Sequence, residues 1–219
     1  DMQKDNNHPD VFQNIIENGI ISHIETNFNG SLSHNLQMIL IPGDLVDNGN
    51  NHDEWVDDFF DAGKNLFSYV PIYPVLGNHE NNSTYFFDYF DLPKNGSAGY
   101  KEHWWFKDQS NIRIIGIDSN WDYQIPIQLE WLDSVLNSTV NDTVIDFVFA
   151  QLHHPHHSEL WPVGNTDFTG LVINKLEDFT NLSGKPSVHF FGHTHGYSRG
   201  QSKDHRHLMV NVASAGGNI

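Results

Sequence analysis

Six polar residues suited to metal binding or proton transfer each follow a predicted strand. They are carboxylate, amide and imidazole residues: Asp44, Asn78, His79, His153, His193 and His195. The stretches before them, such as "MILIPG" and "PIYPVLG", are short apolar runs typical of strands buried on both faces. Because the strands of an open α/β sheet bring their carboxyl ends to one edge, we expect these side chains to meet there.

The types of these side chains predict a site for divalent metal ions. Carboxylate, amide oxygen and imidazole suit ions of intermediate hardness such as Mn²⁺, Fe²⁺, Co²⁺ or Zn²⁺. The chain has no cysteine, which excludes thiolate ligands and disulfides. His193 and His195 are separated by one residue and can point at two neighbouring ions, while Asp44 has two oxygens that can bridge them. The pattern therefore predicts a site with two ions.

Each motif has a simpler explanation when it is taken alone. "GDLVD" can be an acidic turn, "GNHE" a tight turn with a solvated acid, and "LHHPHH" a cluster of surface histidines. With "GHTH" there are four such motifs in this chain. Each follows a separate buried strand, and this order favours the metal site.

The elements that must position these residues alternate between helices and strands. Helical spacing of apolar residues predicts helices over 9–26, 52–70, 85–90, 126–137 and 170–179. Apolar runs bounded by turn residues predict strands within 38–44, 71–80, 100–108, 112–120, 143–155, 186–199 and 207–217. We expect the strand before "GHTH" to end in a glycine-rich turn. No linker or repeat interrupts the chain, so residues 1–219 form one predicted α/β domain.

The four motifs, in this order, resemble the signature motifs of the calcineurin-like metallophosphoesterases. "GHTHGYSR" and the closing "ASAGG" are similar to the purple acid phosphatase branch. The resemblance covers essentially the whole chain. It implies two facing β-sheets flanked by helices, two metal ions at the sheet edge, and hydrolysis of phosphate monoesters or diesters.

The resemblance also implies a role for each matching residue. Asp44 bridges the ions, His195 helps to hold one of them, and the other is held by Asn78, His153 and His193. The family's Asp-x-His motif falls on Asp1 and Gln3, so glutamine replaces the histidine and the strand expected before Asp1 is absent from the sequence. Asp1 and Gln3 are then candidate ligands of the ion that His195 holds. The alternative is that Asp1 is a frayed terminal residue.

Two further roles concern the chemistry. Purple acid phosphatases hold ferric iron with a tyrosine where this chain has Asp47, so two divalent ions are expected instead. The resemblance implies that a water shared by the ions attacks phosphorus and that His79 donates a proton to the leaving oxygen. We expect Glu80 to orient the ring of His79 or to raise its pKa. Three histidines follow the ligand His153 and either contact the phosphate or the leaving group or are solvent-exposed imidazoles: His154, His156 and His157. Asn120 and Trp121, which follow "GIDS", are candidates to line the pocket.

Charge and composition limit the kinds of molecule that this protein is expected to bind. The formal net charge is −17, which argues against nucleic acid and leaves a small phosphate ester as the expected substrate. No apolar run is long enough to span a bilayer. Seven Asn-x-Ser/Thr sequences favour an extracytoplasmic or secreted protein. The alternative to an enzyme is an inactive ligand-binding module on the same fold, for which Gln3 is the supporting feature.

Overall fold

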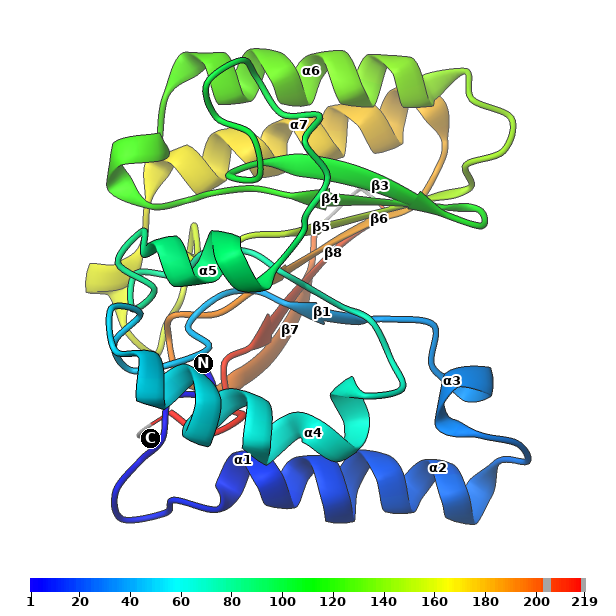
Figure 1. The fold of residues 1–219 in the computed structure, drawn as a ribbon. Helices are drawn as coiled ribbons and strands as arrows, with labels where there is room; N and C mark the ends of the chain where they lie inside the picture. Colours follow the sequence, from blue (N-terminus) through cyan, green and yellow to red (C-terminus); the bar gives the residue numbers. More distant parts are fainter. Residues whose placement is uncertain (203–205, 218–219) are drawn as a thin grey trace.

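The computed structural model describes residues 1–202 and 206–217 and places two β-sheets between layers of helices (Figure 1). The helical segments are α1 Val11–Asn14, η1 Ile15–Ile21, α2 Ser22–Asn27, α3 Leu32–Asn35, η2 Glu54–Phe60, α4 Asp61–Phe67, α5 Thr84–Tyr89, η3 Trp121–Tyr123, α6 Pro126–Val140, η4 Pro162–Gly164 and α7 Asp167–Ser183. The strands are β1 Ile39–Ile41, β2 Ile72–Pro74, β3 Trp105–Gln109, β4 Ile112–Gly116, β5 Phe147–Gln151, β6 Ser187–Phe191, β7 Tyr197–Gln201 and β8 His207–Val212.

The larger sheet has six strands in the order β3-β4-β5-β6-β8-β7. Its four central strands are parallel, and β3 and β7 pair antiparallel at the two edges. The smaller sheet is the parallel pair β1 and β2. Because both sheets contain parallel strands followed by loops, the polar loops after β1, β2, β5 and β6 can gather at one end of the molecule.

Two apolar cores lie on opposite faces of the larger sheet. In β4, Ile114 packs with the core that contains β1, β2 and the helices of the first half of the chain. Its neighbour Ile115 packs with the core under α6 and α7, as expected for side chains that alternate along a strand. The rings of Tyr73 in β2 and Trp105 in β3 lie 6.0 Å apart across the space between the sheets. The predicted fold of two facing sheets flanked by helices is confirmed.

Most predicted elements are present, with one clear error. The helix expected over 9–26 is the continuous run of α1, η1 and α2 over residues 11–27, which widens into π-helical turns in its middle. The strand before "GHTH" ends in a turn over residues 192–196, as expected, but strand β7 follows this turn and was not predicted. All five residues of β7 are exposed, so it has no apolar alternation to reveal it, and it forms by backbone pairing with β8. No helix within residues 1–202 and 206–217 is long and apolar enough to cross a membrane.

Candidate metal centre

The eight residues predicted for the site form one connected network of contacts. Residues 1–3 supply Asp1 and Gln3, and the loops after four strands supply the others: Asp44, Asn78, His79, His153, His193 and His195. Gln3 Nε2 donates to Asp44 Oδ2 at 2.9 Å, and the backbone N–H of His79 donates to Asp44 Oδ1 at 3.0 Å. Asp44 therefore lies at the centre of the network.

The Nε2 atom of His153 lies close to three polar atoms of other residues. Its Nδ1 lies 2.9 Å from the carbonyl oxygen of Pro42, which can only accept, so Nδ1 carries the proton. The other nitrogen, Nε2, lies 3.1 Å from Asp44 Oδ2, 3.0 Å from Asn78 Oδ1 and 3.1 Å from His193 Nδ1. One proton on Nε2 could serve only one of these atoms, whereas a cation would satisfy all of them.

A second set of donors surrounds Asp1. Its carboxylate accepts the backbone N–H of His193 at 3.1 and 3.0 Å and lies 3.5 Å from His195 Nε2. Asp1 is only 3% exposed, so it is not a frayed residue in this structure. Gln3 Oε1 is buried and has no hydrogen-bond partner, although its Nε2 is bound to Asp44. An unpaired buried amide oxygen is costly, and a cation beside it would remove that cost.

These donors fit divalent ions. Among the described residues, two groups place their ligand atoms within 4.8 Å of one another: Asp1, Asp44 and His153, and His153, His154 and His193. Burial, and then repulsion from His153, lowers the pKa of His193 to about 3, so its ring is neutral and able to bind metal. Burial favours a raised pKa for Asp44, but its ion pair and hydrogen bond with His153 hold the pKa well below the usual range. Asp44 is therefore an anion.

Glu80 holds the backbone beneath the site and does not contact the ring of His79. Its two oxygens accept the backbone N–H groups of Asp44 at 2.9 Å, Leu45 at 2.7 Å and Gly77 at 2.6 Å. A side chain at Gly77 would collide with the carboxylate of Asp44, so glycine is required there. Glu80 thus ties the loop after β1 to the loop after β2. The prediction that Glu80 orients the ring of His79 is wrong.

The ring of His79 is held by Asp47 instead. His79 Nδ1 lies 2.6 Å from the carbonyl oxygen of Asp47, and therefore donates its proton there. Nε2 is left as the nitrogen that can act in the cavity that this side chain lines. That cavity has a volume of about 500 Å³.

Three residues of the site have left-handed backbone conformations. The φ angles are 55° for Asp44, 70° for His193 and 20° for His195. Non-glycine residues seldom adopt these conformations, and a cost of about 1–3 kcal/mol each is typical. These angles turn the side chains back toward the network.

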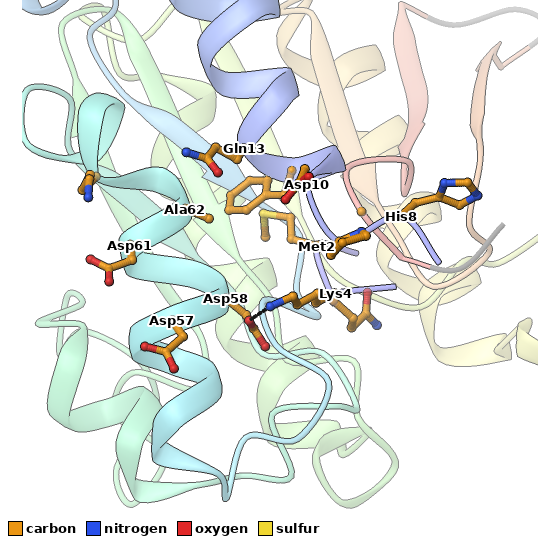
Figure 2. Close-up of a pocket in the computed structure, with 14 residues that line it drawn as sticks. Met2, Lys4, His8, Asp10, Gln13, Asp57, Asp58, Asp61 and Ala62 are labelled. Carbon is orange, nitrogen blue, oxygen red and sulfur yellow. Dashed lines mark hydrogen bonds and ion pairs between the residues drawn. The ribbon is translucent and has the colours of Figure 1, made fainter. Parts of the chain in front are cut away.

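An ion pair fixes the N-terminal segment that carries Asp1 and Gln3. Lys4 Nζ lies 2.8 Å from Asp58 Oδ1 of η2, as Figure 2 shows. Met2 packs in the first apolar core, and its backbone N–H donates to the carbonyl of Asp44 at 2.7 Å. Asp1 and Gln3 are therefore positioned by contacts on both sides of the segment.

Several residues near the site play parts that the sequence did not assign. Ser119 Oγ accepts the backbone N–H groups of His153 and His154, at 3.1 and 2.9 Å, so its own proton is available for His154 Nδ1 at 3.0 Å. His154 is buried beside His193, with 4.4 Å between ring centroids. Leu160 and Trp161 line the cavity, and the apolar character of their loop was the only signal for them.

The other candidate contacts lie elsewhere. His156 Nδ1 is 3.2 Å from the carbonyl oxygen of Thr166, and His156 and His157 line a neighbouring cavity. Asn120 Nδ2 donates to the carbonyl of Gly77 at 3.2 Å and so supports the loop after β2. Trp121 is 72% exposed and does not line the cavity.

The fold and the donor set together define an α/β protein whose site suits divalent metal ions. A sequence model of the calcineurin-like phosphoesterases matches residues 5–197. The chain therefore belongs to the calcineurin-like phosphoesterase family, whose chemistry is metal-dependent hydrolysis of phosphate esters. No curated protein sequence matched the chain.

Solved structures with the same fold include three proteins of different description. One is GAP50, the anchor in the inner membrane complex of Plasmodium, with 17% identity and a TM-score of 0.63 over 93% of this chain and 67% of that chain. Another is purple acid phosphatase PPD1 from yellow lupin, with 16% identity and a TM-score of 0.56 over 94% of this chain and 39% of that chain. The third is a putative 5'-nucleotidase from Staphylococcus aureus, with 13% identity and a TM-score of 0.55 over 95% of this chain and 44% of that chain. This chain thus spans less than half of the phosphatase and nucleotidase chains. At these identities the likeness establishes the fold alone.

Proposed function

We propose that this chain hydrolyses small phosphate monoesters or diesters with two divalent metal ions bound in the candidate metal centre. The observation that carries the proposal is that two oxygens and a ring nitrogen lie 3.0–3.1 Å from His153 Nε2, which a cation would satisfy together. The family assignment supports the reaction class.

The ligands divide into two sets around Asp44. Asn78, His153 and His193 would hold one ion, and Asp1, Gln3 and His195 the other, with Asp44 shared. When bound, the ions would lower the pKa of a water molecule and offset the charge of the phosphoryl oxygens. The carboxamide of Gln3 is a weaker ligand than an imidazole, so the second set should bind its ion less tightly.

His79 is the proposed proton donor for the leaving oxygen. Because the carbonyl of Asp47 holds a proton on Nδ1, a second proton on the ring must lie on Nε2. His79 lines the cavity beside Asp44 and Asn78, where an ester oxygen would leave. Transfer of this proton would assist departure of a basic alcohol.

Metal content and hydrolysis measured on the same samples test the proposal. The protein is stripped with chelator, reloaded with Mn²⁺, Fe²⁺, Co²⁺ or Zn²⁺, and assayed on p-nitrophenyl phosphate and bis(p-nitrophenyl) phosphate. We expect close to two ions per chain and activity that is lost on chelation. His153→Ala should bind fewer ions and lose at least 100-fold in rate, whereas the exposed His34→Ala serves as the matched control. Two bound ions and full turnover in His153→Ala would refute the site.

A binding module is the second candidate, because Gln3 replaces the family's histidine and GAP50 is described as an anchor. Bound metal without turnover on either ester would favour this role. The same preparation distinguishes the two candidates, since only the enzyme gives chelator-sensitive hydrolysis.

We also propose an extracytoplasmic location. All seven asparagines of the Asn-x-Ser/Thr sequences are exposed, which is required for glycosylation: Asn29, Asn81, Asn82, Asn95, Asn137, Asn141 and Asn181. Secretion from a eukaryotic host should give a product whose electrophoretic mobility increases on treatment with an N-glycosidase. An unchanged mobility would remove this support.

A further inference from the structure

A second cavity of 470 Å³ lies next to the candidate metal centre, at the large sheet beside α7. Its lining includes Ile173 of α7, Phe191 of β6 and Met209 of β8, which are apolar. Figure 1 shows α7 crossing over this sheet. The cavity is large enough for the organic part of a drug-sized molecule.

The two cavities share a wall. Leu160 lines both of them and packs against Gly196, the residue after the candidate ligand His195. Leu160 is 59% exposed, so it borders the cavities without closing the space above them. A group attached to a phosphate at the metal centre can therefore extend past Leu160 into the second cavity.

One buried polar group accompanies the apolar lining. His189 lines the cavity, is 1% exposed, and has its Nδ1 2.8 Å from His207 Nε2. His207 Nδ1 lies 2.7 Å from Ser187 Oγ, which lies 2.6 Å from Thr180 Oγ1. This chain of hydrogen bonds fixes the ring of His189 and leaves Nε2 as the nitrogen available to a ligand.

The charges around the cavity disfavour an anionic occupant. Glu159 and Glu177 line it together with a single arginine, Arg199. The lining also includes His156 and His157, and the apolar side chains together with the fixed ring of His189 suit a neutral, flat aromatic group that carries a hydrogen-bonding atom.

We propose that the second cavity binds the organic group of the substrate, and that the substrates are phosphate esters of large, neutral aromatic alcohols or phenols. This inference rests on the proposed function, because it assigns the specificity of the same site.

The chain offers a substitution that fills the cavity without a steric conflict. Gly200 lines the cavity and pairs across the sheet with Met209, so a side chain at position 200 projects from the same face as that of Met209. A Cβ at Gly200 would meet nothing within 4 Å. Gly200→Phe should thus occupy the cavity, and Gly19→Phe is the matched control, since Gly19 is exposed on η1 and equally open.

The test compares 2-naphthyl phosphate with phenyl phosphate, whose leaving groups have similar acidity. We expect kcat/KM of the wild type to be at least tenfold higher for the naphthyl ester, and Gly200→Phe to lower this ratio at least fivefold. Gly19→Phe should keep the wild-type ratio. A wild-type ratio near one, or a ratio that Gly200→Phe leaves unchanged, would overturn the inference while the hydrolysis of phenyl phosphate upholds the proposed function.

If neither ester is hydrolysed, the proposed function has failed and the cavity is tested by binding. Calorimetric titration with 2-naphthylmethylphosphonate in the presence of Mn²⁺ should then give about tenfold weaker binding to Gly200→Phe than to the wild type and to Gly19→Phe. Equal affinities for all three proteins would overturn the inference.

Discussion

Mild acid should destabilise the protein through His189. This ring is buried, and burial, followed by repulsion from His207 and His156, holds its pKa well below the ordinary value of 6.5. In the unfolded chain the same ring takes up a proton near pH 6.5, so the unfolded state binds more protons than the folded state below that pH. The stability contributed by the neutral ring is therefore complete above pH 6.5 and is lost as the pH falls.

The size of the effect follows from the difference in pKa. One pH unit below 6.5 costs about 1.4 kcal/mol for a histidine that stays neutral in the folded protein. Between pH 7.5 and 5.5, His189 should thus lower the free energy of unfolding by about 1.4 kcal/mol. His154 and His193 add losses of the same sign in metal-free protein, because their pKa values are lowered to about 2 and about 3.

Urea unfolding of the chelated protein at pH 7.5 and 5.5 isolates the part due to His189. His189→Leu loses the hydrogen bond to His207 and should be less stable at both pH values. Its free energy of unfolding should nevertheless fall about 1.4 kcal/mol less between the two pH values than that of the wild type, since the contributions of the histidines that do not interact with His189 cancel. His34→Leu, at an exposed position, should follow the wild-type curve. Parallel curves for His189→Leu and the wild type would refute the reasoning.

Three further changes test individual contacts. His79→Ala should retain both metal ions and lose about 10²–10⁴-fold on phenyl phosphate but less on p-nitrophenyl phosphate, which needs no proton; equal losses in the two assays would exclude proton donation. Asp44→Asn should lower the number of bound ions measured by elemental analysis, and retention of two ions would remove Asp44 as the shared ligand. Glu80→Gln places an amide donor against backbone N–H groups, so urea unfolding should show a free energy of unfolding that is lower by about 2–4 kcal/mol. The exposed Glu25→Gln should change this free energy very little. Similar stabilities of these two variants would contradict the role of Glu80.

The sequence predicted that these residues lie together because its signals are local. A buried strand is an apolar run, and the polar residue that ends it follows directly, as in the segments that lead to Asp44 and His153. The topology of parallel strands then brings these ends together without any knowledge of side-chain geometry. The contacts of Asp44 with Gln3, His79 and His153 are the outcome.

The support of the site was less predictable, since it depends on contacts between distant backbone segments. The position of Glu80 beside His79 in sequence suggested contact between the two side chains, but Glu80 turns inward to the N–H groups of the loop after β1. The carbonyl of Asp47 holds the ring of His79, and a carbonyl group carries no sequence signal. Strand β7 escaped prediction for the same reason, because an exposed edge strand is fixed by backbone pairing with β8.

Because Asp44, His193 and His195 have left-handed conformations, substitutions at these positions can raise stability while they lower activity. Glycine at these positions would relieve the backbone. A library screened only for heat resistance would therefore enrich glycine at three positions that we propose as metal ligands. Thermostable variants of this chain should be sought with these three positions held constant and with a metal-dependent assay as a second screen.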